Sequence, residues 1–301
     1  MEFFFQQLTN GLTVGSIYAL IALGYTMVYG VLKLINFAHG DLFTIGAFLG
    51  LTLLTSLGLT NNIGAVGGVI VLAVMVIALV AIIGALLERS AYRPLRQSPR
   101  LSAVVSALGA SIFFQNAIML IYGARVRVFP HDILPSTAIN ILGLDIPVIR
   151  IGVFLCSLIM MAGLYLFIQK TKIGTAIRAA AIDQGAAKLM GINVDQVIMI
   201  VFMIGPALGG AAGLMVGLYY GQITFTMGWV YGLKAFTAAI LGGIGNIPGA
   251  MLGGILLGVI EALGAAYISI AWKDGIAFCV LILILLVRPT GILGERVAEK
   301  V

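Results

Sequence analysis

Six stretches of this chain, each 19 residues or longer, contain no Asp, Glu, Lys or Arg. They are residues 3–32, 42–87, 101–124, 151–169, 196–233 and 235–260. A helix needs about 20 apolar residues to cross the hydrocarbon core of a bilayer, so the stretch 42–87 is long enough to cross twice. Charged residues make up 9% of the chain, whereas soluble domains need about 25% to solvate their surface. The sequence therefore predicts a polytopic membrane protein.

The spans are predicted to be helical, because lipid offers the backbone amides no hydrogen-bond partners. The alternating segments of a membrane β-barrel, roughly ten residues long, are absent from the sequence. A turn rich in Asn and Gly at residues 60–64 divides the long stretch. The predicted helices cover residues 11–32, 42–58, 65–87, 101–123, 148–169, 197–219, two crossings within the glycine-rich region 227–268, and a last span near 275–289. We expect a single all-α transmembrane domain over residues 1–301, with about eight or nine spans.

The basic residues are clustered in short segments between the spans. Segments 88–100 and 170–196 each contain four of them. Because Lys and Arg accumulate in cytoplasmic loops, both segments are predicted to be cytoplasmic, with the N-terminus outside and the C-terminus inside. The same placement indicates that the net charge of +6 orients the chain in a membrane and does not bind nucleic acid. Residues 124–147 form the long external connection, either a solvated loop or a surface for an outer partner.

Motifs for catalysis, cofactors and metals are absent from the sequence. No Gly-x-Ser-x-Gly nucleophile elbow occurs, and no lysine follows a glycine, which excludes a phosphate-binding Gly-Lys-Ser/Thr loop. Glu2 stands where a cleavable signal peptide carries bases, so none is expected. Cys156 and Cys279 are not spaced as a metal site, and we expect both to be buried thiols. The chain is not expected to be an enzyme or to hold a cofactor, and any transport takes its energy from a partner or an ion gradient.

A dense polar cluster follows the first predicted span. It consists of Asn36, His39, Gly40 and Asp41. Ionisable groups within a membrane are costly, so one interpretation is a broken helix or gate that lines a transport path. The other is a tight cytoplasmic turn that Asn36 and His39 solvate, with Asp41 capping the next helix. The residues alone favour the turn.

A second interruption is predicted within Leu241–Gly249. Its glycines, together with Asn246 and Pro248, make a continuous helix costly. Broken helices at membrane depth occur where the backbone is buried in protein or lines a cavity, so Gly243, Gly245, Asn246 and Pro248 are candidates for the path. A tight turn at the inner surface is an equally good interpretation.

Small and polar residues inside the spans predict helix packing. Glycines recur every three or four residues over 205–217, which lets helix backbones approach closely in lipid. Gln115 and Asn116 are expected to join helices by hydrogen bonds. Glu261 is expected to lie at an exposed helix end or to be paired, in preference to serving as a proton relay.

The segment 174–193 is too short and too charged to span the membrane. Ala179, Ile182, Ala186 and Leu189 form one apolar stripe at helical spacing. Its charged residues, Arg178, Asp183 and Lys188, remain available to water or a partner. A short helix of this kind suits docking into a groove on another protein. A helix that lies on the bilayer surface is the alternative.

Several blocks of the sequence resemble one protein family over the full length of the chain. They are GSIYALIALGYTMVYGVLKLINFAHGD (15–41), ERSAYRPLR (88–96), the loop 178–193, KAFTAAILGGIGNIPGAMLGG (234–254) and RPTGILG (288–294). The chain resembles the H-type permease subunit of the branched-chain amino-acid ABC transporter family. Its alanine-rich segment with Gly191 near the end is similar to the cytoplasmic coupling loop of ABC importers. Residues 124–147 match the family least well.

This resemblance implies half of a translocation path for leucine, isoleucine and valine in the bacterial inner membrane. It implies four partners: a second, related permease subunit, two cytoplasmic ATPase subunits and an external solute-binding protein. Residues 174–193 are expected to receive the motion of the ATPases, and residues 36–41 with 242–249 to shape the path. Two alternatives remain: a permease of the same family for urea, a short amide or another neutral amino acid, and an ion-coupled transporter that works alone.

Overall fold

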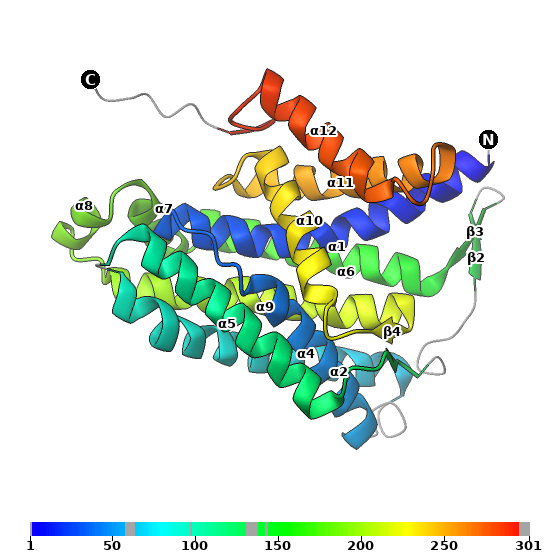
Figure 1. Cartoon of the computed structure of the whole chain (residues 1–301), viewed down its shortest axis with the longest axis horizontal. Helices are drawn as coiled ribbons and strands as arrows, with labels where there is room; N and C mark the ends of the chain where they lie inside the picture. Colours follow the sequence, from blue (N-terminus) through cyan, green and yellow to red (C-terminus); the bar gives the residue numbers. More distant parts are fainter. Residues whose placement is uncertain (1, 58–63, 97, 131–137, 142–143, 295–301) are drawn as a thin grey trace.

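A computed structural model describes residues 2–57, 64–96, 98–130, 138–141 and 144–294 (Figure 1). Within these described ranges, seven helices are long and apolar enough to cross a membrane. They are α1 (Glu2–Leu32), α2 (His39–Leu57), α4 (Ala65–Leu87), α5 (Arg100–Tyr122), α6 (Val148–Lys170), α9 (Val194–Tyr220) and α11 (Ile247–Tyr267). The apolar helices α10 (Met227–Gly242) and α12 (Lys273–Val287) are shorter. The predicted all-α, multi-pass architecture is therefore confirmed.

The remaining elements are short and lie at the two ends of the helix bundle. A π-helical turn η1 (Glu88–Tyr92) and a 3₁₀ turn η2 (Arg93–Leu95) follow α4, and the helices α7 (Lys172–Ile182) and α8 (Gln184–Leu189) follow α6. Strand β1 (Arg127–Val128) pairs antiparallel with β4 (Gln222–Ile223), and β2 (Ala138–Ile141) with β3 (Leu144–Pro147). Parts of the predicted turn 60–64 and of the predicted external connection 124–147 lie outside the described residues.

Both base-rich segments lie at one end of the bundle. In Figure 1, η1–η2 and α7–α8 are at the left, with the end of α1, and the strands and the N-terminus are at the right. Two helices, α5 and α6, separate the base-rich segments along the chain. The predicted orientation places both base-rich segments on the cytoplasmic side, which requires them to lie at the same end of the bundle.

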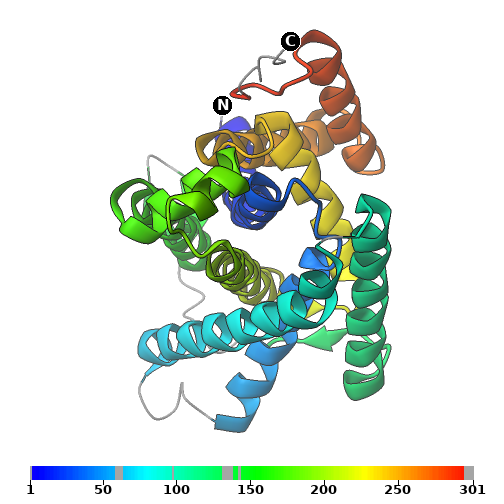
Figure 2. The same ribbon diagram turned by 90° about the vertical axis from the view of Figure 1, so that its left-hand side faces the viewer.

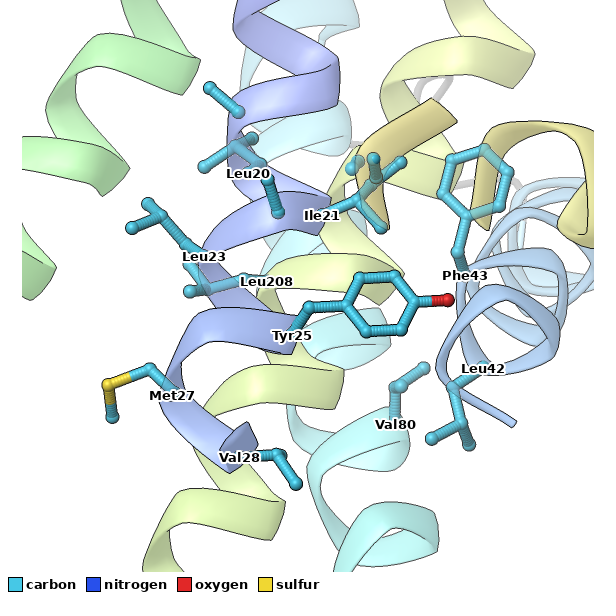
Figure 3. Packing of buried hydrophobic residues seen from close by; sticks show 14 of the residues in the cluster. Leu20, Ile21, Leu23, Tyr25, Met27, Val28, Leu42, Phe43, Val80 and Leu208 are labelled. Carbon is cyan, nitrogen blue, oxygen red and sulfur yellow. The ribbon is translucent and has the colours of Figure 1, made fainter. Parts of the chain in front are cut away.

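Helix α1 is the centre of the fold. It is buried along most of its length and packs against α9, α10 and α11 (Figure 2). Glycines make the closest approaches possible, as the sequence predicts for residues 205–217. A Cβ atom on Gly258 of α11 would lie 2.2 Å from the Cα of Gly15, and one on Gly46 of α2 would lie 2.3 Å from the Cα of Gly210. Leu20, Ile21 and Leu23 lie among the apolar side chains that fill the spaces between these helices (Figure 3).

Three predictions about residues inside the spans are wrong. Cys156 and Cys279 are exposed on α6 and α12, because these outer helices turn one face away from the core. Asn116 is also exposed, and its Nδ2 donates to the carbonyl of Ile112 in its own helix at 2.7 Å. The amino-acid sequence identifies an apolar span, but an all-apolar helix carries no signal for which face points inward.

Candidate functional site

The connection between α1 and α2 enters the bundle. Helix α1 ends at Leu32, and Lys33 adopts a left-handed conformation with φ of 54°. Helix α2 begins at His39, whose Nε2 lies 3.2 Å from the carbonyl oxygen of Ile21. Ile21 is eleven residues before the end of α1, which corresponds to roughly 16 Å along the helix. Residues 33–38 therefore return alongside α1, and α2 begins at about half its depth (Figure 1).

The polar residues of this interruption are buried. Asn36, His39 and Asp41 are all shielded from solvent within this chain. The Asn36 Oδ1 accepts the backbone N–H of Ala38 at 3.1 Å, so Asn36 stabilises the turn that precedes α2. Asp41 Oδ2 instead accepts the hydroxyl of Ser111 on α5 at 2.5 Å. The solvated turn capped by Asp41, which the residues alone favoured, is therefore wrong: the connection between the two helices is non-helical and its polar side chains are buried.

A small pocket of about 50 Å³ lies beside this interruption. Asp41 is the one acidic residue in its lining, which otherwise consists of two glycines and of aromatic and aliphatic residues. The lining residues are Tyr25, Ile35, Phe37, Asp41, Gly228, Trp229, Gly232, Leu233 and Phe236. Figure 3 shows Tyr25 reaching from α1 toward α2. No ion pair involving Asp41 occurs among the described residues.

Helices α2 and α10 cross at their first turns beside the pocket. A Cβ atom on Gly40 would lie 2.2 Å from the carbonyl oxygen of Gly228, so Gly40 has to be a glycine. Trp229 and Leu233 of α10 are exposed on the outer surface of the chain. The pocket therefore lies at a face that this chain leaves open.

The predicted coupling segment is folded as two helices. Asp183 interrupts it and accepts the backbone N–H groups of Gly185 and Ala186 at 2.7 and 3.0 Å, as the N-cap of α8. The Arg178 guanidinium donates to the carbonyl of Ile168 and, at 3.2 Å, to the Gln169 side chain at the end of α6. The prediction of one short helix is therefore wrong. The side chains of Arg178 and Asp183 hold the segment in place.

The predicted apolar stripe is largely exposed. Ile182 and Leu189 have relative exposures of 89 and 90%, and Ala186 is also exposed. Met190, which was not part of the predicted stripe, is 83% exposed next to Leu189. Ala179 is the exception, because it packs against the core. Lys188 and Gly191 are exposed at the end of α8, where Gly191 has the positive φ of 82° that often terminates a helix. In Figure 1, α8 lies beyond the end of α1, so this apolar surface is at the tip of the bundle.

Residues 242–249 form a tight turn at the same end. Helix α10 stops at Gly242 and α11 starts at Ile247, with Asn246 as its N-cap through a 2.9 Å bond from Gly249 N–H. Asn246 Nδ2 also donates to the carbonyl of Leu293 at 2.9 Å, which ties the turn to the segment 288–294. Gly245 and Pro248 are exposed. The described residues show no hydrogen bond between this turn and residues 36–41.

Glu261 belongs to a buried charge cluster, as its predicted pairing requires. Its Oε1 lies 2.8 Å from Lys234 Nζ and 2.7 Å from Lys273 Nζ, and it accepts the Tyr18 hydroxyl at 3.2 Å. Lys234 also pairs with Asp274 at 2.7 Å. The cluster joins α1, α10, α11 and α12. Pairing of this kind is what allows charged side chains to lie inside an apolar bundle.

Comparison with known proteins identifies the family. A family model described as branched-chain amino acid transport system / permease component matches residues 7–285. The chain belongs to this permease family. It is 47% identical over 307 residues to the high-affinity branched-chain amino acid transport system permease protein BraD of Pseudomonas aeruginosa, with 99% of this chain and 98% of the relative covered.

Two further relatives come from a bacterium and an archaeon, Escherichia coli and Methanocaldococcus jannaschii. The permease is 43% identical over 304 residues to the high-affinity branched-chain amino acid transport system permease protein LivH of Escherichia coli K12, covering 99% of this chain and 98% of the relative. It is 27% identical over 294 residues to the probable branched-chain amino acid transport permease protein LivH of Methanocaldococcus jannaschii, covering 95% and 91%. No solved structure matches the chain.

Sequence reasoning missed a second charge cluster in the permease. Glu88 is fully buried where α4 meets η1, and Arg96 forms ion pairs with Glu88 and, at 2.5 Å, with Asp195 at the start of α9. Tyr92, in η1, donates its hydroxyl to Asn36 Oδ1 at 2.8 Å. The one available signal was an acid, Glu88, at the boundary between an apolar span and a basic segment. It could not have indicated partners from distant parts of the chain.

Proposed function

We propose that this chain is a membrane-spanning permease subunit of an ABC importer that takes up leucine, isoleucine and valine. The relatives named BraD and LivH, which cover nearly the whole chain, support this substrate class. The observation that carries the proposal is the interrupted connection between α1 and α2, with its buried polar residues and apolar pocket. Transporter helices are interrupted in this way where substrates pass.

The path is proposed to run along the open face beside this interruption. Non-helical backbone at membrane depth is tolerated against protein or a water-filled cavity, and it is not tolerated against lipid. Ile35 and Phe37 of the non-helical segment are only partly buried within this chain. A second, related permease subunit would cover them and complete the path. Asn36, His39, Gly40 and Asp41 are the path residues of this proposal, and Asp41 would attract the ammonium group of a passing amino acid.

The turn 242–249 has a separate role in this proposal. Gly243 has φ of 107°, and a Cβ atom there would lie 2.5 Å from the backbone nitrogen of Gly294. The turn thus joins the α10–α11 hairpin to the segment 288–294. Its effect on the path is indirect, through the position of α10, whose first turns line the pocket.

ATPase subunits are proposed to dock on α7–α8 from the cytoplasm. The support is the exposed apolar surface of Ile182, Ala186, Leu189 and Met190 at the tip of the bundle. Exposed apolar patches mark sites of interaction, and this one protrudes past the end of α1 (Figure 1). The N-terminus would then be outside, the C-terminus inside, and an external binding protein would deliver the substrate. ATP hydrolysis would occur on the partners.

Two other functions are distinguishable from this one. A permease of the same family for urea, a short amide or another neutral amino acid would have the same architecture, and uptake of labelled solutes separates these substrates. An ion-coupled transporter would work alone, without ATPases. The charge clusters of Glu261 and of Glu88 do not favour a proton relay, because both carboxylates are paired with bases.

The docking proposal is tested by Ala186→Trp. Ala186 is exposed on α8, and Trp would prevent the close approach of a protein groove, whereas lipid accepts it readily. The same substitution at Ala162, which is exposed on the outer face of α6, is the matched control. We expect Ala186→Trp to abolish both leucine uptake and co-purification of the ATPases at normal permease abundance. Unchanged uptake and ATPase recovery would show that α8 lies on the bilayer surface instead.

A further inference from the structure

The coupling segment is hydrogen-bonded to the end of α1. Gln184, the first residue of α8, donates its Nε2–H to the carbonyl oxygen of Val31 at 2.7 Å. Val31 lies in the last turn of α1, two residues before the left-handed Lys33. A carbonyl in the last turn of a helix has no partner within that helix, so a side-chain donor satisfies it. This bond therefore fixes the start of residues 33–38 relative to α8.

A second connection begins where the coupling segment continues into α9. Asp195, in the first turn of α9, pairs with Arg96 at 2.5 Å and with Arg93 at 3.6 Å. Arg96 also pairs with the buried Glu88. These ion pairs link the start of α9 to η1 and η2, which lie between α4 and α5.

The second connection ends on the interruption itself. Tyr92, in η1, is buried, and its ring packs on Phe202 of α9 with centroids 4.8 Å apart. Its hydroxyl donates to Asn36 Oδ1, the same oxygen that accepts Ala38 N–H in the turn before α2. A displacement of η1 therefore acts directly on the turn that leads into α2.

We infer that Gln184 and Tyr92 are positioning residues that transmit motion from the coupling segment to the interrupted α1–α2 connection. The inference rests on the proposed function, since it requires ATPases to move α7–α8. Both connections act on residues 33–38, one at the start and one at Asn36. The π-helical turn η1 is a local departure from regular helix, of the kind found at functional sites in helices. Motion at the tip thus reaches the pocket lined by Ile35, Phe37 and Asp41.

The test measures leucine transported per ATP hydrolysed in proteoliposomes that contain the complete complex. Tyr92→Phe removes the hydroxyl and keeps the ring. Tyr219→Phe is the matched control, because the Tyr219 hydroxyl donates to Asn10 Oδ1 at 2.6 Å, at the opposite end of α1 and α9. We expect Tyr92→Phe to lower the leucine-to-ATP ratio at least fivefold, with ATP hydrolysis within twofold of wild type. Tyr219→Phe should leave the ratio unchanged.

A structural role alone would reduce the amount of assembled complex, and would lower uptake and ATP hydrolysis together without changing their ratio. An unchanged leucine-to-ATP ratio in Tyr92→Phe would overturn the inference. ATP-dependent leucine uptake by the wild-type complex would still support the proposed function. If Tyr92→Phe does not assemble, the partly buried Gln184 carries the test through Gln184→Leu, with the same criterion. Absence of ATP-dependent leucine uptake by the wild-type complex would reject the proposed function itself.

Discussion

Substitution of Glu261 by Gln should destabilise the permease by about 3 kcal/mol. The side chains of Glu261 and Lys234 are 2 and 8% exposed and lie 2.8 Å apart. Removing one partner of a buried ion pair typically costs about 3–5 kcal/mol, because the other charge stays in a medium of low dielectric constant. Asp274 remains 2.7 Å from Lys234 after the change, which places the expected cost at the lower end of that range.

Lys273→Met provides the comparison within the same cluster. The Lys273 side chain is 36% exposed, and Glu261 retains Lys234 when Lys273 is removed. Partly exposed ion pairs contribute about 0–1 kcal/mol, so this variant should lose no more than that. The double variant Lys234→Met with Glu261→Gln should be more stable than Glu261→Gln alone. It removes both charges of the buried pair, so no unpaired Lys234 charge stays buried.

The assay is unfolding of the purified permease in mixed micelles, followed by circular dichroism during titration with SDS. The reasoning predicts a large loss for Glu261→Gln, a small one for Lys273→Met and partial recovery in the double variant. Equal losses for Glu261→Gln and Lys273→Met, or a loss below about 1 kcal/mol for Glu261→Gln, would refute the view that burial decides the cost.

Three further predictions follow from local geometry. Gly213→Ala should impair folding, because the added Cβ atom would lie 2.0 Å from a carbonyl oxygen of α2. Gly163→Ala has no atom within 4 Å of the added Cβ atom and should be neutral or stabilise the permease by up to about 1 kcal/mol. Thermal unfolding in detergent measures the stability of both variants. Gly245→Leu should destabilise the α10–α11 turn through backbone strain alone, because Gly245 has φ of 97° and no atom lies within 4 Å of an added Cβ atom. Gly245→Asn should be more stable than Gly245→Leu, because Asn tolerates a positive φ better, and equal stability of the two variants would contradict this. In a cysteine-free background, Ser98→Cys should react with an impermeant thiol reagent only after cells are opened, and labelling of intact cells would reverse the proposed orientation.

The sequence was most informative where one physical requirement acts along a continuous segment. The lengths of the apolar stretches predict the main helices, because the thickness of the bilayer sets the length of a span. Ends of helices were less predictable. Helix α1 starts at Glu2 and not at residue 11, because the polar residues before Gly11 are accommodated in the helix, where the Thr9 hydroxyl donates to the carbonyl of Gln6.

The interruptions show what a sequence signal can specify. Asn246 and Pro248 correctly predicted a break, but not its depth, because the depth depends on how α10 and α11 pack. The break at Asp183 had a signal that the helical stripe concealed: an Asp before an alanine-rich run is a favoured N-cap. The position of His39 beside Ile21 had none, since it depends on the path of residues 33–38 back along α1.

The candidate site depends on contacts between distant residues. Tyr92 and Asn36 are 56 positions apart, and Arg96 and Asp195 are 99 apart. Each of these side chains has several possible partners at one end of the bundle, and only the packed helices select among them. Asn36 through Asp41 could be identified from their unusual polarity, whereas the bonds that join them to the coupling segment required the structure.

Uptake of labelled leucine into proteoliposomes of defined composition tests the proposed function most directly. Vesicles would contain the permease with its related membrane subunit, with or without the ATPase subunits, and with binding protein outside and ATP inside. We predict leucine uptake only when the ATPases and ATP are both present, and competition by isoleucine and valine but not by urea. Uptake by the membrane subunits alone, driven by an ion gradient, or uptake of urea in place of leucine, would contradict the account.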